Sequence, residues 1–516
     1  MMTTATRPYA RRWLALMVLA ASLLVVSIGN TILNLALPSI RDDLDASSSE
    51  LQWILDGYML VFAGLLLVAG SLGDRFGRRR TLFVGLATFA LGSLLAALAP
   101  GTNELIAARA LMGVGAAAIM PVTLSVVTNI FPERERARAI AVWSAAAGLG
   151  VAIGPLTGGW LIEHTDWRGI FLLNLPAVLV CALGATIFVP ESRDPRPARL
   201  DLVGALLSIG GLGAFVYGLI EAPERGWSDP LILAAFAAGI AIGAAFIAWE
   251  RRVAEPMLQL AVFRNPRFSA ASASIAFVYF ALMGVLYMNT TYLQTVLGHS
   301  PFEAGLRLLA PAAGMILASR PSVPLTRRLG TKIVVATGLA ITAGSLLLLS
   351  GFDTTGGDTQ IALALGLMGF GIGLGMTPAT EAIMGSLPPA KAGIGSAMND
   401  VVREVAGTLG IAVLGSLLSS AYASRIDGAV DALPADAAAA AGDSVGAAHE
   451  LAAAIGGSAG ADLTSAANDA FMHAFATTAT IAAAIAAAGA VIAAAFLPAR
   501  ERPATVGAAI PEPAPA

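Results

Sequence analysis

Long apolar runs recur along almost the whole chain and are separated by short polar stretches. A helix needs about 20 mostly apolar residues to cross a bilayer, and we mark fourteen runs near that length. The pattern therefore predicts an all-α polytopic membrane protein. The predicted spans are 13–37, 51–72, 81–99, 105–130, 139–162, 169–189, 202–220, 231–249, 269–292, 305–325, 333–351, 361–387, 395–421 and 471–497.

The positions of Arg and Lys test this map. With the N-terminus in the cytoplasm, 23 of the 31 Arg and Lys residues fall in cytoplasmic segments and 4 in outer loops. Cytoplasmic loops of membrane proteins carry such an excess, so we expect both termini in the cytoplasm. We also expect multi-pass insertion in the cytoplasmic (inner) membrane of a bacterium. The first apolar run is longer than the roughly 7–15 residues of a signal peptide core.

The composition excludes several other classes of protein. Of the 516 residues, 57% are hydrophobic and 13% are charged, whereas soluble domains have about 45–50% and about 25%. A net charge of −3 gives no indication of a nucleic-acid partner. The single cysteine, Cys181, cannot form an intrachain disulfide. The one long outer loop, 423–469, is rich in Ala, Gly and Asp, and both small helices and a loose chain remain open there.

Short segments of the first six predicted spans recur in the last six. Residues 111–115 match residues 367–371, Asn30 matches Asn289, and Gly77 matches Gly330, at offsets of 256, 259 and 253. The two halves are thus predicted duplicates in parallel orientation, with two spans inserted between them. Such repeats are typical of transporters, whose substrate site lies between the halves. Two halves retained for stability alone are the alternative.

Two segments have the spacing of recognisable motifs. The second span ends in a tight turn that carries one acid among several bases, which could also be only a positive-inside anchor. The fifth span repeats glycine every four residues beside a proline, which could also serve close helix packing alone. The residues are Gly73, Asp74, Arg75, Gly77 and Arg78 in the turn, and Gly150, Gly154, Pro155, Gly158 and Gly159 in the span.

On these motifs the chain resembles the major facilitator superfamily. Residues 29–38, 53–58 and 399–404 further resemble its 14-helix drug:proton antiporters, the group of the bacterial quaternary-ammonium and methylenomycin exporters. The resemblance covers nearly the whole chain outside both tails and the Ala-rich loop. Gly29 stands where many of these exporters have an acidic residue, which puts a dicationic substrate in doubt.

The resemblance implies the major facilitator fold, with two six-helix bundles plus two inserted helices. We accordingly divide the chain into five parts. These are a cytoplasmic tail (1–12), an N-terminal bundle (13–190), two inserted helices with their cytoplasmic loops (191–268), a C-terminal bundle that includes loop 423–469 (269–497) and a second cytoplasmic tail (498–516).

Charged residues inside the spans are candidates for transport chemistry, because they are costly there. Asp400 and Glu404 lie one helical turn apart on one face, with Arg403 beside them. A carboxyl group removed from water exchanges protons closer to neutral pH, so proton coupling and a structural ion pair both remain open.

Asp56 lies about one turn inside its span, where it could exchange protons or cap the helix. Arg109 occupies the position of the intramembrane Arg in the family signature, and we hypothesise that it controls the protonation of Asp56.

Other candidates are polar or aromatic. Glu381 lies near the cytoplasmic end of its span, while Asn30 and Asn289 could line a cavity or bond neighbouring helices. Aromatic residues that could stack on drugs, or anchor the membrane interface instead, are Trp53, Tyr58, Tyr279 and Tyr287.

The expected function is proton-coupled export of lipophilic, cationic or aromatic compounds by alternating access. The sequence has no Gly-Lys pair and so lacks the usual phosphate-binding loop. We therefore expect no cofactor, no metal and the proton motive force as the energy source, in a monomer. Export of an endogenous metabolite or lipid, or a sensor without flux, are the alternatives. An enzyme is disfavoured, because the four histidines lie in loops or at span ends.

Overall fold

The computed structural model describes residues 10–193, 200–253, 255–354, 357–386, 392–431 and 433–498. Every regular element among these residues is helical. Thirteen described segments are long and apolar enough to cross a membrane, and α5 (Glu133–His164) is a further long helix that packs along α1. The prediction of an all-α polytopic protein is confirmed.

The helices follow the predicted order. In the first half they are α1 (Arg12–Leu44), α2 (Ser48–Phe76), α3 (Arg78–Ala97), α4 (Thr102–Ile130), α5, α6 (Gly169–Leu172) and α7 (Asn174–Phe188). The inserted helices are α8 (Leu202–Arg225) and α9 (Pro230–Glu250). In the second half they are η1 (Leu260–Arg264), α10 (Pro266–Thr291), η2 (Tyr292–Val296), α11 (Pro301–Arg307), α12 (Leu309–Leu329), α13 (Thr331–Leu349), α14 (Asp358–Gly385), α15 (Ala392–Val430), α16 (Ala435–Asp443), α17 (Val445–Ile455) and α18 (Gly457–Phe496).

Local chemistry explains several helix starts. Ser47 caps α2 and Ser300 caps α11, each in a capping box with the glutamate three residues later, which satisfies two otherwise unpaired N–H groups. Hydrophobicity alone predicted the ends of the helices less well than their positions, because the backbone hydrogen bonds of a helix continue after its side chains become polar. For example, α1 continues beyond residue 37, the predicted end, to Leu44 with Pro38 inside it.

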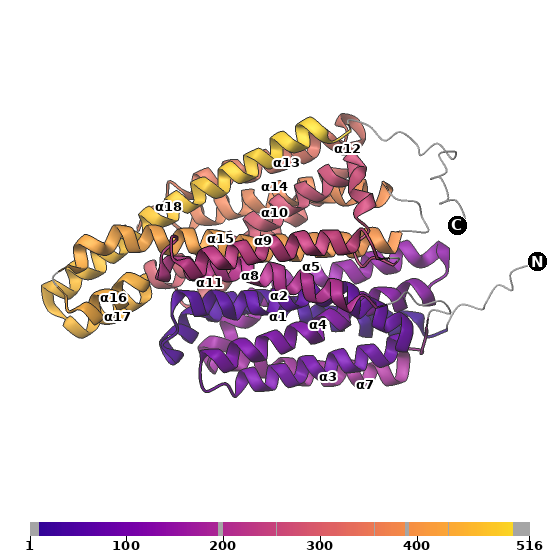
Figure 1. Ribbon diagram of the computed structural model, residues 1–516, viewed down its shortest axis with the longest axis horizontal. Coiled ribbons are helices and arrows are strands. Elements are labelled where there is room, and N and C mark those ends of the chain that lie inside the picture. The colour runs from indigo at the N-terminus through magenta and orange to yellow at the C-terminus, as the bar shows by residue number, and fades with distance from the viewer. Residues whose placement is uncertain are drawn as a thin grey trace, which may run out of the picture.

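The helices run side by side along the long axis of the molecule (Figure 1). In the first half α4 packs on α2 and α3, and α1 packs on α5 and α7. In the second half α14 packs on α12 and α13, and α10 packs on α15 and α18. The inserted pair packs against both halves, because α8 contacts α2 and also α15.

The Ala-rich segment 423–469 is helical. It consists of the last turns of α15, the two short helices α16 and α17, and the first turns of α18. The hydroxyl group of Tyr422 donates to the carbonyl group of Ala441 at 3.0 Å, which holds α16 against α15. We call α16 and α17 the helical hairpin, and the end of the bundle where they lie the hairpin end. At the opposite end, the terminal end, α1 begins and α18 ends (Figure 1).

The predicted repeat has a conformational counterpart. Gly77, between α2 and α3, has φ +111, and its repeat partner Gly330, between α12 and α13, has φ +89. Residues with a Cβ atom rarely adopt a positive φ angle of this size, so glycine is favoured at both turns. The matching turns agree with a duplicated helix–turn–helix.

Replacing Gly77 with Ala should lower the thermal unfolding midpoint of the purified protein. The strained backbone costs about 1–3 kcal/mol, and the new Cβ would lie 2.7 Å from Oε1 of Glu191. Gly210→Ala in α8 is the matched control, because open space surrounds that position and Ala favours a helix. An equal midpoint for both variants would contradict the assignment of strain to Gly77.

Candidate functional site

The two halves make direct polar contacts at the hairpin end. Nε2 of Gln294, in η2, donates to the carbonyl oxygen of Leu35 at 2.9 Å. The backbone N–H of Phe302, in α11, donates to Oε1 of Glu163 at 3.0 Å. These bonds join η2 and α11 of the second half to α1 and α5 of the first. The hairpin end is therefore closed.

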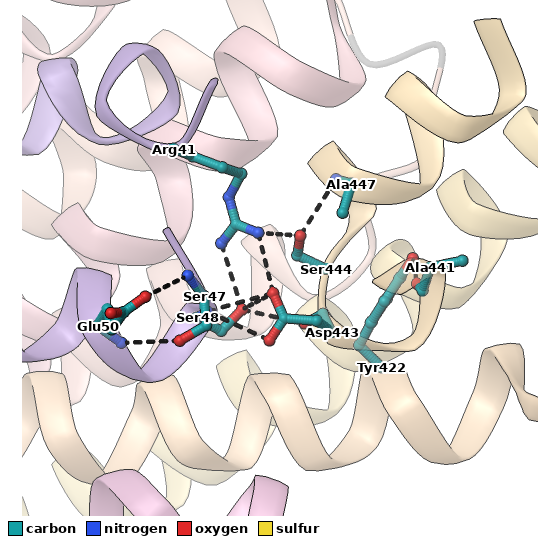
Figure 2. A network of polar contacts seen from close by, with 9 residues as sticks. All are labelled: Arg41, Ser47, Ser48, Glu50, Tyr422, Ala441, Asp443, Ser444 and Ala447. Carbon is teal, nitrogen blue, oxygen red and sulfur yellow. Dashed lines mark hydrogen bonds and ion pairs between the residues drawn. The ribbon is translucent and has the colours of Figure 1, made fainter. Parts of the chain in front are cut away.

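The helical hairpin adds an ion pair to this closure (Figure 2). Nη1 of Arg41, near the end of α1, lies 3.1 Å from Oδ2 of Asp443, at the end of α16. The backbone N–H of Ser48, at the start of α2, donates to the same carboxylate at 3.2 Å. Arg41 also donates to the hydroxyl group of Ser444. Since both charged side chains are mostly buried, this network fastens the hairpin to the first half.

The glycine face of α5 permits its close approach to neighbouring helices. A methyl group at Gly150 would lie 2.5 Å from Cβ of Ser27, and those at Gly154 and Gly158 would collide with Thr31 and Ile32 of α1. At Gly159 it would lie 2.5 Å from the carbonyl oxygen of Pro301, in the other half. The motif, with Pro155 inside the helix, thus packs α5 against both α1 and α11.

The turn between α2 and α3 is held by charged groups at the terminal end. Nε and Nη2 of Arg78 donate to Oδ1 of Asp74 at 2.9 and 2.8 Å. The chain after α7 secures the other side, because Oε1 of Glu191 accepts from the backbone N–H of Arg79 at 3.1 Å. Gly73 allows α2 to approach Val122 of α4, and Arg75 stacks on Phe76 at 5.8 Å. All these bonds stay within the first half.

The charged turn of α15 faces α10. Nη1 of Arg403 lies 3.6 Å from Oδ1 of Asp400, and its guanidinium group lies 4.5 Å from the ring centre of Tyr279. Glu404, one turn after Asp400, is partly buried. The structure therefore brings together the three charges that the sequence placed on one helical turn, and adds Tyr279 as their neighbour.

Arg109 is bound by α2 rather than by an acid. Its Nε donates to the carbonyl oxygen of Ile54 at 3.2 Å, and its guanidinium group lies 4.3 Å from the ring centre of Tyr58. These partners precede and follow Asp56 by two residues, yet no ion pair joins Arg109 to Asp56 among the described residues. Both side chains are buried, with 1% and 0% of their surface exposed.

Tyr58 lies between the two charged groups. It stacks on Arg109 in the first half, and its helix, α2, packs on α15, which carries Glu404 in the second half. The sequence indicated Tyr58 only as one of several aromatic candidates. Its position between the charged groups depends on how α2 and α15 pack, and no spacing within the chain reveals that.

The remaining candidates from the sequence lie apart from Arg109, Tyr58 and the charged residues of α15. Glu381 is exposed on α14. Asn289 is fully buried, and its Nδ2 donates to the carbonyl oxygen of Val285 in its own helix at 2.9 Å. The side chain of Asn30 lies outside the described residues. The described part of the chain contains no group of three or more His, Cys, Asp or Glu residues that could hold a metal ion.

A cavity of about 410 Å³ lies under the helical hairpin. Its walls come from α1, α2, α10, α15, α17 and α18, so both halves contribute. Tyr287 and Leu51 lie in its lining, and Asp42 and Glu450 are exposed there. Partial removal from water raises the pKa of the Glu450 carboxyl group, and the neighbouring Asp42 carboxyl group raises it further.

Two helical halves that meet at one end, with charges gathered between them, define a polytopic membrane protein of the transporter type. The profile of the Major Facilitator Superfamily matches residues 19–411, and the chain belongs to that family. The predicted resemblance is thereby confirmed.

The relatives agree with this assignment. The chain is 38% identical over 493 residues to the multidrug efflux pump LfrA of Mycolicibacterium smegmatis, covering 95% of this chain and 97% of the relative. It is 37% identical over 426 residues to the puromycin resistance protein pur8 of Streptomyces alboniger, covering 81% and 84%.

Solved structures share the fold. A bacterial homolog of the human lysosomal transporter Spinster, in an inward-facing and unoccupied conformation, superposes with a TM-score of 0.67 at 19% identity. The match covers 96% of this chain and 99% of that one.

Replacing Asp443 with Asn should open the hairpin end more often. Loss of a partly buried ion pair worth about 1 kcal/mol would change the ratio of closed to open forms about fivefold. Spin labels at Asn103→Cys and Asp427→Cys, in a Cys181→Ala background, would report the distance across this end. Asp436→Asn, at an exposed acid of the same hairpin, should leave the distances unchanged. Identical distributions in the two variants would contradict a closing role for Asp443.

Proposed function

We propose that this protein is a proton-coupled exporter of lipophilic drugs or antibiotics. The observation that carries the proposal is the charged turn of α15, which lies at the boundary between the halves. Arg403 joins Asp400 to Tyr279 there, Glu404 follows one turn later, and α15 packs on α2 of the other half. A carboxyl group at such a boundary can bind either a proton or a cationic substrate, and it can respond when the halves move.

The relatives support the same class of substrate. They are named for multidrug efflux and for resistance to puromycin and tetracenomycin C. The candidate site offers matching chemistry, because carboxylates attract cations and tyrosine rings stack on aromatic or cationic groups.

In alternating access the binding site opens to one side of the membrane at a time, so the closed end of the structure indicates the side from which substrate enters. The closed hairpin end leaves the terminal end as the side from which a substrate would enter. We infer that the terminal end faces the cytoplasm of a bacterial inner membrane, as the Arg and Lys distribution indicates. Residues 13–190 and 269–497 would then move as the two bundles of a monomer, with 191–268 as the inserted segment.

The proton motive force would supply the energy without a cofactor or an enzymatic step. One charge crossing 100 mV is worth about 2.3 kcal/mol. Exchange of one proton for one neutral substrate could therefore sustain a concentration gradient of about fiftyfold per 100 mV. Exchange of one proton for a monovalent cation moves no net charge, so the pH gradient alone would drive it.

Asp400→Asn should strongly reduce substrate-dependent proton movement. In respiring inside-out vesicles with a pH-sensitive dye, cationic, neutral and anionic compounds would be added in turn. We expect dequenching by lipophilic cations, reduced at least about tenfold in the variant, because a proton-transfer group is lost. Asp462→Asn, at an exposed acid of α18, is the control. Inserted wild-type protein that responds to no compound would favour a metabolite exporter or a sensor.

Arg109→Ala should change the pH dependence of transport if Arg109 controls the protonation of Asp56. The guanidinium group holds the segment of α2 on both sides of Asp56, so its loss would alter the surroundings of that carboxyl group. Transport rates between pH 6 and 8, roughly the range of proton-exchanging groups, would be compared with those of Arg320→Ala, at an exposed position of α12. Unchanged pH dependence in Arg109→Ala would contradict the hypothesis.

A further inference from the structure

One turn of α2 contains an unusual number of buried polar atoms. Gln52 and Asp56 are four residues apart, so they share a helix face, and both are completely buried. Neither the two amide atoms of Gln52 nor the two carboxyl oxygens of Asp56 has a hydrogen-bond partner among the described residues. Polar atoms left in this way are costly. In folded proteins, ordered water normally satisfies such atoms.

Tyr287 connects this turn to the cavity under the helical hairpin. It extends from α10, is 6% exposed and forms part of the cavity lining. Its hydroxyl group lies near the amide of Gln52, without a hydrogen bond between them, and within electrostatic range of Asp56. Polar groups thus follow one another from the cavity to Asp56, with gaps that water could bridge.

The helices pack closely around Gln52. Even a methyl group at Gly415 of α15 would lie 2.8 Å from Cδ of Gln52. Meanwhile the halves stay joined at the hairpin end through Gln294 and Leu35. This packing leaves no room for a drug molecule between the cavity and Asp56, whereas single water molecules would be enough to pass a proton.

The cavity itself suits the uptake of protons. Besides Tyr287 and Tyr422, the charged and titratable groups in its lining are Arg41, Asp42, His299, Asp443, His449 and Glu450. Arg41 is held by Asp443, so the carboxyl groups of Asp42 and Glu450 dominate the exposed rim. These two carboxyl groups interact, and the pKa of Glu450 is raised, first by its partial removal from water and then by Asp42. Such a pair retains a proton at higher pH than an isolated glutamate.

We propose that the cavity under the helical hairpin is the proton entrance of this protein, and that Tyr287 and Gln52 are positioning residues that hold the water leading to Asp56. A proton passes from the cavity along this water to the Asp56 carboxylate, which becomes neutral, and it can return the same way. The proposal rests on the proton coupling proposed above and names its route. Protons and drugs then use separate openings while the hairpin end is closed.

Gln52→Leu and Tyr287→Phe test this route in proteoliposomes. Two reactions would be measured with tetraphenylphosphonium, namely exchange of labelled for unlabelled probe and uptake driven by a pH gradient. Exchange needs binding and movement of the halves, whereas driven uptake also needs proton transfer. We expect near-normal exchange and driven uptake slowed at least about tenfold, as for other lost proton-transfer groups. Gln52→Asn, which keeps an amide, should restore much of the driven uptake.

Thr342→Val, which removes a buried hydroxyl group in α13, is the matched control and should leave both reactions normal. Normal driven uptake in Gln52→Leu and Tyr287→Phe would overturn the route. Loss of both reactions in folded Gln52→Leu and Tyr287→Phe, with no recovery in Gln52→Asn, would assign these residues a structural role and also overturn it. Wild-type protein that exchanges the probe without any driven uptake would instead overturn proton coupling itself.

Discussion

Charged side chains inside a membrane-spanning bundle are costly unless they find a partner or reach a water-filled cavity. This constraint determines where the charges of the chain lie. Arg109 obtains a carbonyl group and an aromatic ring from α2, and Arg403 obtains a carboxylate and a ring from α15 and α10. Each arrangement is built within one half, and α2 and α15, which carry part of each, pack against each other across the halves. Movement of the halves would therefore change the surroundings of each charge.

Close helix contact is the complementary requirement. The glycines of α5 allow contact with α1 and α11 at distances that a methyl group would prevent. Packing of small residues lets helices associate in lipid, where the hydrophobic effect contributes little. The same helix thus joins its own half and touches the other, so the packing of α5 influences how firmly the hairpin end stays closed.

Much of this architecture could be predicted from the sequence, because spans, charge bias and repeats are local patterns. Gly77 and Gly330 were matched by offset and have matching turns. Asp400, Arg403 and Glu404 were placed on one turn by spacing. The partners of Arg109 could not be predicted, because its charge suggests an acidic partner. In the structure its partners are the carbonyl group of Ile54 and the ring of Tyr58. Gln52 carried no signal, because its importance arises from packing against Gly415. The Ala-rich loop was left open, although the high helix propensity of alanine favoured helices there.

The continuity of α15 has a mechanical consequence. This helix contains 39 residues and is therefore about 58 Å long. It carries Asp400 and Glu404 near one end and leads into the helical hairpin at the other. A stiff rod that tilts about its middle moves its two ends in opposite directions. A change in the charge of Asp400 or Glu404 that tilts α15 would therefore move the far end of this helix and strain the ion pair between Asp443 and Arg41. No chain of intermediate contacts is needed.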